Sequence, residues 1–301
     1  MKLLTVTSSP HLRDNSSTST IMRDVLIALL PAVVASVLIF KVSALLVILT
    51  CVICAVGSEF VWEKLMHLPV TIGDLSAAVT GTLLAMCLPA DLPLWMAGLG
   101  SVIAIIVIKQ LFGGIGQNFA NPAITARVIL LISFGQMATF TYDGVSTATP
   151  MMIMNGAEGT LPGVQSMLLG THGGSLGETC AVALLVGGVY LLVRKVISWH
   201  IPVCFIGTVL IGSLIAGISP LHALTGGGLL LGAIFMATDY STSPMSKLGK
   251  IIYGVGCGLL TLLIRIFGTL PEGVSYAILL MNILTPHIDK LTQQKAMGGT
   301  K

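Results

Sequence analysis

Long apolar runs separated by short polar stretches repeat along almost the whole chain. About ten runs are present, with approximate limits 21–40, 42–62, 74–88, 92–110, 123–140, 178–196, 201–218, 221–237, 250–268 and 274–288. About twenty apolar residues in a helix are long enough to cross the hydrocarbon core of a bilayer. The pattern therefore predicts an all-α polytopic membrane protein with about ten transmembrane helices.

Composition excludes a soluble fold. The 301 residues are 54% hydrophobic and 9% charged, and the mean hydropathy is +0.97. Soluble domains carry about 25% charged residues. The net charge of +3 is spread over loops, so it does not indicate nucleic-acid binding, and the expected surroundings are membrane lipid.

The basic residues gather at alternate ends of the predicted helices. Of the 15 Lys and Arg residues, all but Lys41 and Arg265 fall on one side of the predicted membrane. Lys and Arg accumulate on the cytoplasmic side of membrane proteins. We therefore expect a multi-pass protein of the cytoplasmic (inner) membrane with both termini in the cytoplasm. The loop Thr141–Gly177, which lacks Lys and Arg, is expected outside.

This orientation divides the chain into five parts. They are a cytoplasmic tail (1–20), a first membrane half (21–140), an extracytoplasmic loop (141–177), a second membrane half (178–288) and a second cytoplasmic tail (289–301). The third span of each half is short and rich in small residues, as in "GTLLAMCLPAD" and "GLLLGAIFMATD". Each half has an odd number of spans, so the second half would enter the membrane from the opposite side and the two halves would be inverted repeats. Proteins with this arrangement have binding sites between the repeats. Chance likeness between apolar segments is the alternative.

One polar stretch, "KQLFGGIGQNFANPAITAR", interrupts the first half. Asn118 and Asn121 offer amide donors and acceptors, and Asn121 is expected to cap a helix that begins at Pro122. Arg127 would then lie about one turn inside the span, where it must be paired or face a cavity. The alternative is a snorkelling anchor. Lys109, at the end of the preceding span, is expected to reach solvent in that way.

A second polar stretch, "FMATDYSTSP", follows the short span of the second half. Asp239 can serve as a helix-end cap, a partner for Arg127 or part of an ion or cofactor site. The neighbouring glycines form neither of the common nucleotide-binding motifs. The other acidic residues expected to be buried are Glu59 and Asp74.

Two further features carry candidate chemistry. Cys51 and Cys54 form a CxxC on a helix face, but without a second pair they are best interpreted as small apolar fillers rather than metal ligands. The loop stretch "DGVSTATP" places Ser146, Thr147 and Thr149 close together. Taken alone, such threonines are ordinary loop residues.

Four stretches in the same order carry a family resemblance. "SPHLRDNSSTSTIMRDVLIALLPA", "KQLFGGIGQNFANPA", "SLGETCAVALLVGG" and "FMATDYSTSP" resemble the RnfD subunit of the Rnf complexes, which are ion-translocating ferredoxin:NAD⁺ oxidoreductases. The related NqrB subunit of the sodium-translocating NADH:quinone reductase carries similar stretches. The likeness to this family (NqrB/RnfD) runs from about Ser9 to Pro286.

The resemblance implies two flavins. Members carry FMN joined by a phosphoester to the last threonine of an S-x-A-T motif, which here is Ser146-Thr147-Ala148-Thr149, so Thr149 is the expected acceptor. Thr147 departs from the more usual glycine. A second, non-covalent flavin (riboflavin) between the halves would be surrounded by Asn118, Asn121, Arg127 and Asp239.

The resemblance also implies partners and a role. The chain would be one member of a redox-driven ion translocase, not catalytic alone, with the other Rnf subunits (A, B, C, E and G) as partners and a flavin transferase for maturation. Electrons would pass from ferredoxin to NAD⁺ and drive Na⁺ or H⁺ outward. No catalytic or metal-binding residue is assigned. The alternative from the residues alone is a solute channel or transporter of inverted-repeat fold without redox activity.

Overall fold

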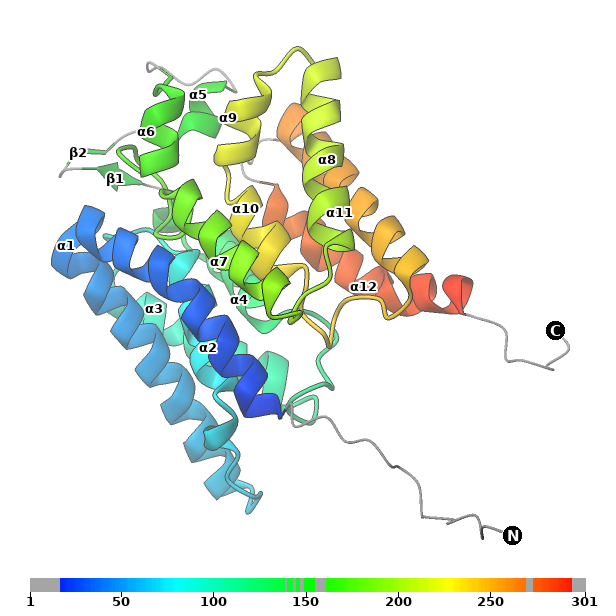
Figure 1. Cartoon of the computed structure of the whole chain (residues 1–301). Helices are drawn as coiled ribbons and strands as arrows, with labels where there is room; N and C mark the ends of the chain where they lie inside the picture. Colours follow the sequence, from blue (N-terminus) through cyan, green and yellow to red (C-terminus); the bar gives the residue numbers. More distant parts are fainter. Residues whose placement is uncertain are drawn as a thin grey trace, which may run out of the picture.

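The computed structural model describes residues 17–138, 140–142, 145–146, 149–154, 161–268 and 273–293 (Figure 1). These residues form helices together with a single two-stranded hairpin. The all-helical character predicted from the apolar pattern is confirmed. Most of both predicted tails, Thr147 and Ala148 lie outside the described residues.

The helices follow the apolar runs of the sequence. Their bounds are α1 Thr18–Leu65, α2 Ser76–Met86, α3 Leu94–Val102, α4 Pro122–Ser133, α5 Pro150–Met154, α6 Val164–Leu169, α7 Ala181–Val193, α8 His200–Ile215, α9 Pro220–Thr225, α10 Leu229–Leu231, α11 Lys247–Phe267 and α12 Val274–Thr292. Helix α3 continues as a π-helix over Ile103–Gln110, and α10 continues as a π-helix over Gly232–Met236. Single 3₁₀ turns occupy Ile72–Asp74 and Gly135–Ala138.

Helix α1 consists of two arms that lie side by side in Figure 1. The break is at Lys41, the one residue inside α1 with non-helical angles (φ 57, ψ −133). Ser17 caps the first arm in a reciprocal capping box with Thr20, in the polar stretch before the first apolar run, where the sequence offers a helix cap. One polar residue between two apolar runs thus marks the chain reversal.

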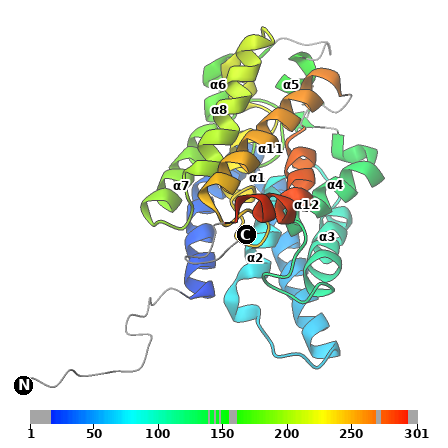
Figure 2. The ribbon, with the colours of Figure 1, turned by 90° about the vertical axis from the view of Figure 1, so that its right-hand side faces the viewer.

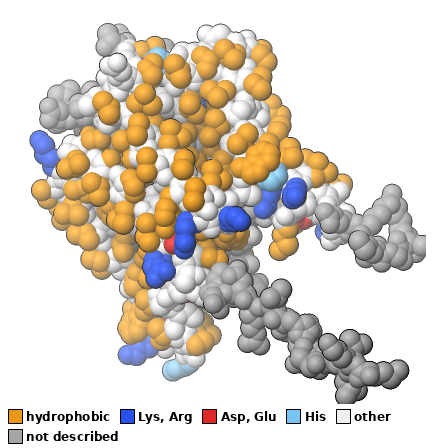
Figure 3. All heavy atoms as spheres, viewed as in Figure 1, with side chains coloured by type: hydrophobic (Ala, Val, Ile, Leu, Met, Phe, Trp, Pro, Cys, Tyr) orange, Lys and Arg blue, Asp and Glu red, His pale blue; other side chains and the backbone are white. Residues whose placement is uncertain are grey.

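The described helices include two that are long and apolar enough to cross a membrane, namely Thr18–Leu65 and Lys247–Phe267. Shorter apolar helices occupy Ser76–Met86, Leu94–Gln110, Pro122–Ser133, Ala181–Val193 and His200–Ile215. Hydrophobic side chains cover most of the face seen in Figure 3, and most of its Lys and Arg side chains lie along the lower part. Such a surface is typical of a protein whose solvent is lipid.

The third run of each half forms only short helices, and that of the second half is interrupted. Helix α2 has only 11 residues. In the second half the helix α9 stops at Thr225, and α10 begins after Gly227 and Gly228, which have φ of +68 and +65. Left-handed angles are open to glycine at little cost, so these glycines permit the break.

The segment predicted as a long external loop has structure of its own. A small antiparallel hairpin pairs β1 (Thr141–Tyr142) with β2 (Val145–Ser146). Helices α5 and α6 follow, and α6 ends at Gly170 in the left-handed conformation. In Figure 1 these elements lie beside α9. The loop is therefore packed against the helices of the second half.

The two halves of the chain meet where α1 crosses α7. In Figures 1 and 2 the blue and cyan helices gather on one side and the yellow and orange helices on the other. At the crossing, a Cβ added to Gly187 would stand 2.1 Å from the carbonyl oxygen of Ala28. Nearby, Arg194 and Tyr190 both bond to the carboxylate of Asp24. Close backbone contact therefore depends on glycine here.

We predict that Gly187→Ala destabilises the protein by about 1–3 kcal/mol, because the added methyl overpacks this crossing. Gly207→Ala in α8 is the matched control, since a Cβ there meets nothing within 4 Å. The control should be neutral or slightly stabilising. Thermal unfolding of both variants in detergent checks this, and equal midpoints would contradict the tight crossing.

Candidate functional site

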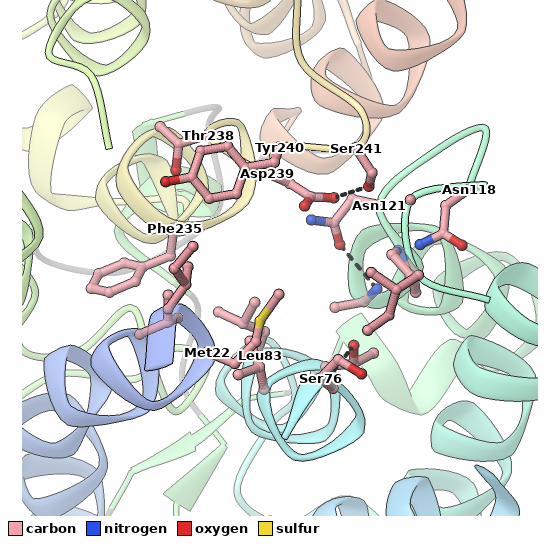
Figure 4. A pocket seen from close by; sticks show the side chains of 18 of the residues that line it. Met22, Ser76, Leu83, Asn118, Asn121, Phe235, Thr238, Asp239, Tyr240 and Ser241 are labelled. Atoms are coloured by element: carbon pink, nitrogen blue, oxygen red, sulfur yellow. Dashed lines mark hydrogen bonds between the residues drawn. The ribbon is translucent and has the colours of Figure 1, made fainter. Parts of the chain in front are cut away.

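A cavity of about 470 Å³ opens between the two halves (Figure 4). Small-molecule sites in proteins have volumes of about 300–1,000 Å³. The apolar wall comes from α1, α2, α7 and the second π-helix, and the polar wall includes Asn118, Asn121 and Asp239, which the sequence had singled out. Polar residues of the lining are Thr18, Ser76, Thr80, Lys109, Asn118, Asn121, Thr238, Asp239, Tyr240 and Ser241.

Asn121 holds one corner of the cavity. Its Oδ1 accepts hydrogen bonds from the backbone N–H groups of Ala123 (3.0 Å) and Ile124 (3.3 Å), with Pro122 in the first turn of α4. The predicted cap is therefore confirmed. Its Nδ2 donates to the carbonyl oxygen of Met236 at 3.3 Å. A single amide thus joins the start of α4 to the end of the second π-helix.

Asn118 also lines this cavity, and in Figure 4 its amide nitrogen faces the cavity while its oxygen points away from it. Its Oδ1 is buried and has no hydrogen-bond partner among the described residues. Buried acceptors are almost always satisfied by protein, water or a ligand. The amide nitrogen, on the cavity side, can donate a hydrogen bond to a molecule that fills the cavity.

Asp239 lies in the link between the second π-helix and α11. Its carboxylate accepts hydrogen bonds from Ser241 (3.0 Å) and Thr242 (3.2 Å). The enclosing protein removes water and raises the pKa of Asp239, while the bonds from Ser241 and Thr242 act in the opposite direction. As Figure 4 shows, the carboxylate lies beside Asn121 at the cavity wall.

Arg127 does not belong to this cavity. It is 5% exposed, and its Nη1 donates to Ser275 Oγ at 2.9 Å on α12. Arg127 does not form the ion pair with Asp239, and it is too deeply buried to be a snorkelling anchor. Its expected place beside Asn118 and Asn121 is wrong, because it does not line the cavity. Arg127 is a buried arginine of α4 that bonds to α12.

Lys109 also differs from its expectation. It was predicted to reach solvent from the end of its span, but it is 2% exposed. Its Nζ lies 2.5 Å from Glu59 Oε1 on α1. The π-helical turn carries Lys109 inward, and a buried carboxylate fixes it there. Glu59 was correctly expected to be buried, but its pairing could not be inferred from spacing.

Thr149 is buried and caps a helix. It is 1% exposed, and its Oγ1 accepts from the backbone N–H of Met152 at 3.3 Å, at the start of α5. The expectation of an exposed loop threonine is thus wrong for this arrangement. Next to it, Met151 packs beside Gly226 and Gly227. Ser146 lies in the hairpin strand just before, while Thr147 and Ala148 are outside the described residues.

Sequence reasoning missed a polar cluster near this threonine. Arg265 is buried and donates to the carbonyl oxygens of Ala223 (2.8 Å) and Gly226 (3.0 Å). Glu178 accepts from the backbone N–H of Gly227 and from Ser175. Both charges stabilise the glycine link between α9 and α10. Two sequence features could have indicated this cluster. They are the "GGG" stretch inside the eighth apolar run and the single arginine inside the apolar run of α11.

The CxxC cysteines show no metal-like arrangement. Cys51 is buried, and its Sγ lies 3.7 Å from the carbonyl oxygen of Ala97. The described residues hold no group of three or more His, Cys, Asp or Glu side chains suited to a metal ion. Their interpretation as small packing residues fits these contacts.

We predict that Asn121→Ala lowers the free energy of unfolding by about 1–2 kcal/mol, because α4 loses its cap and Met236 its partner. Asn118→Ala is the matched control from the same wall and should change stability by less than about 0.5 kcal/mol. Chemical denaturation in detergent measures both. Equal losses would mean that Asn121 is not a structural link.

Comparisons with known proteins identify the family of this chain. The model of the NQR2, RnfD, RnfE family matches residues 5–298. The D subunit of the Na⁺-translocating ferredoxin:NAD⁺ oxidoreductase complex of Acetobacterium woodii is 47% identical, over 99% of this chain and 96% of its own length. The D subunit of the proton-translocating ferredoxin:NAD⁺ oxidoreductase complex of Clostridium ljungdahlii is 44% identical over 98% and 96%. The D subunit of an ion-translocating oxidoreductase complex of Stutzerimonas stutzeri is 39% identical over 94% and 93%. The chain belongs to the NQR2, RnfD, RnfE family.

Proposed function

We propose that this chain is the flavin-carrying membrane subunit of an ion-translocating ferredoxin:NAD⁺ oxidoreductase complex. The observation that carries the proposal is similarity along nearly the entire length to relatives named as the D subunits of such complexes. The chain is not catalytic alone. It works with the other subunits (A, B, C, E and G), receives electrons that originate from ferredoxin and end on NAD⁺, and contributes to the outward movement of Na⁺ or H⁺.

The redox role is preferred to a solute channel or transporter. A cavity between two halves suits either function, and fold alone does not decide. The relatives named above are subunits of oxidoreductase complexes, which favours electron transfer.

The proposed topology has ten membrane spans in two inverted halves, with both termini in the cytoplasm. Three features support it: the break of α1 at Lys41, the short helices at the third run of each half and the bias of basic residues. In this orientation the Asn118–Asp239 cavity faces the cytoplasm, and the α5–α9 face with Thr149 lies outside.

Thr149 is the proposed attachment point of FMN. The oxygen required for a phosphoester is present, and an ester oxygen can still accept the N–H of Met152. With 1% of Thr149 exposed, the arrangement described leaves no room for a transferase. Attachment therefore requires α5 to move away from its contact with Gly226 and Gly227. Once bound, FMN supplies one- and two-electron chemistry, and the protein supplies position and electrostatics.

The cavity is the proposed place of a second, non-covalent flavin. Three of the four residues expected around it, Asn118, Asn121 and Asp239, line one wall. The amide nitrogen of Asn118, which faces the cavity in Figure 4, can donate a hydrogen bond. The Asp239 carboxylate can accept bonds from hydroxyls of the kind that a ribityl chain carries. The apolar wall with Phe235 and Leu83 (Figure 4) suits an aromatic ring system.

We predict that single cysteines at Leu161 and Gln293 are labelled from opposite sides of the membrane. Both side chains are exposed in the protein, and the background variant has the six native cysteines replaced by alanine. An impermeant maleimide applied to intact cells should label Leu161→Cys, and Gln293→Cys should react only after permeabilisation. Labelling of both from outside would refute the topology.

We predict that Thr149→Asn abolishes covalent FMN while leaving the fold intact. Asparagine is as good a helix cap as threonine but has no hydroxyl to esterify. Coexpressed with its flavin transferase, the wild-type chain should give a fluorescent band in denaturing electrophoresis and a matching increase in intact mass. Both signals should disappear in Thr149→Asn.

Two controls separate chemistry from folding. Thr149→Ser keeps the hydroxyl and should retain some band, whereas Thr149→Val removes both hydroxyl and cap and should cost about 1 kcal/mol in stability as well. A band that persists in Thr149→Asn would move the attachment to another residue. A wild-type chain without any band would remove the flavin from the proposed function.

A further inference from the structure

A buried ion pair joins α1 to the first π-helix. Glu59 Oε1 lies 2.5 Å from Lys109 Nζ, and the Lys109 and Glu59 side chains are 3% and 0% exposed. The Nε2 of Gln110 donates to the same oxygen at 2.9 Å. Removing one partner of a buried pair costs about 3–5 kcal/mol, because the other charge is left uncompensated. Glu59 therefore needs a positively charged partner whenever it is ionised.

One oxygen of Glu59 is not used by this pair. Lys109 and Gln110 both bond to Oε1, and Oε2 is buried without a hydrogen-bond partner among the described residues. A carboxylate offers about four acceptor positions over its two oxygens. Leaving a buried acceptor such as Oε2 without a hydrogen bond costs free energy, so this oxygen is expected to bind a ligand.

The Lys109 ammonium group can leave the ion pair by moving into the neighbouring cavity. Lys109 and Ser76 both line the 470 Å³ cavity, whereas Glu59 lies behind them. Lys109 Nζ also donates to Ser76 Oγ at 2.5 Å. The flexible lysine stem allows its charge to withdraw into the cavity. The vacated position then lies beside Glu59 Oε1 and Ser76 Oγ, and Oε2 of the same carboxylate is unpaired among the described residues.

The surroundings favour a cation at this position. Asp74 and Glu63 lie close enough to act electrostatically on Glu59, so negative charge gathers around this carboxylate. Hard cations prefer carboxylate and hydroxyl oxygens. The described residues offer no cluster of three or more ligands for a divalent or transition metal, and a single carboxylate with hydroxyls suits a monovalent ion.

We propose that Glu59 is the carboxylate of a Na⁺ site, for which Na⁺ and the Lys109 ammonium compete. Lys109 holds the site when Na⁺ is absent, and it swings into the cavity when Na⁺ binds to Glu59 and Ser76. The net charge at Glu59 is thus compensated in both states. The use of this exchange in ion transport rests on the proposed function, but the binding itself does not.

Thermal unfolding of the full chain in detergent tests the exchange without any redox step or flavin. Midpoints are measured in increasing NaCl at constant ionic strength, with KCl and choline chloride as replacement salts. Wild type should show a Na⁺-specific rise. In Lys109→Met the competitor is gone, so half-saturation should occur at a Na⁺ concentration at least about tenfold lower. Glu59→Gln should show no Na⁺-specific rise.

Two further variants make the test decisive. Glu59→Gln/Lys109→Met replaces the pair by neutral groups and should fold in every salt without a Na⁺ response. Asp24→Asn is the matched control, because Asp24 is another buried carboxylate of α1 and pairs with Arg194, and it should keep the response. An unchanged Na⁺ response in Glu59→Gln would overturn the site.

Other outcomes also overturn the proposal. If Lys109→Met fails to fold even in NaCl while the double variant folds, Na⁺ cannot take the place of the lysine charge. If acid stabilises Lys109→Met equally in NaCl and in choline chloride, Glu59 takes a proton instead of Na⁺. Either result can be distinguished from loss of the covalent flavin, which is scored by fluorescence.

Discussion

The ends of the two short helices impose the constraint on which the rest of the structure depends. An α-helix leaves its last carbonyl groups without partners, and in an apolar interior each must be satisfied by protein. The carbonyl oxygens of Met86 and Leu88 accept from the backbone N–H groups of Gly177 and Leu176. That of Met236 accepts from Asn121. Segments distant in sequence are thus tied to the centre of the molecule, and the cavity forms beside them.

Three buried cations must also be satisfied by protein groups, and each is stabilised in a different way. Arg265 donates to carbonyl groups of the α9–α10 link, which keeps an interrupted helix rigid. Arg127 bonds to Ser275 and joins α4 to α12. Lys109 is paired with a carboxylate and borders a cavity. A charge held by fixed backbone dipoles is structural, whereas one held by a carboxylate beside open space can be exchanged.

The burial of Thr149 links packing to cofactor chemistry. Its hydroxyl oxygen caps α5, and the next turn packs against glycines whose conformation depends on Glu178 and Arg265. Opening this segment would break few apolar contacts, because α5 has only five residues. A short capped helix is therefore a physically reasonable cover for the proposed attachment residue, which a flavin transferase would have to reach once, during maturation.

The sequence by itself determined the helical class, the break at Lys41, the caps at Ser17 and Asn121, and the family, because apolar periodicity, capping chemistry and motif order are local. It also singled out Asn118, Asn121 and Asp239, which the structure brings to one wall. Only the tertiary structure decided which charges are inside. The pairing of Lys109 with Glu59, the separation of Arg127 from Asp239 and the burial of Thr149 depend on which helix faces meet. Those contacts join residues up to 148 positions apart, and no local pattern specifies them.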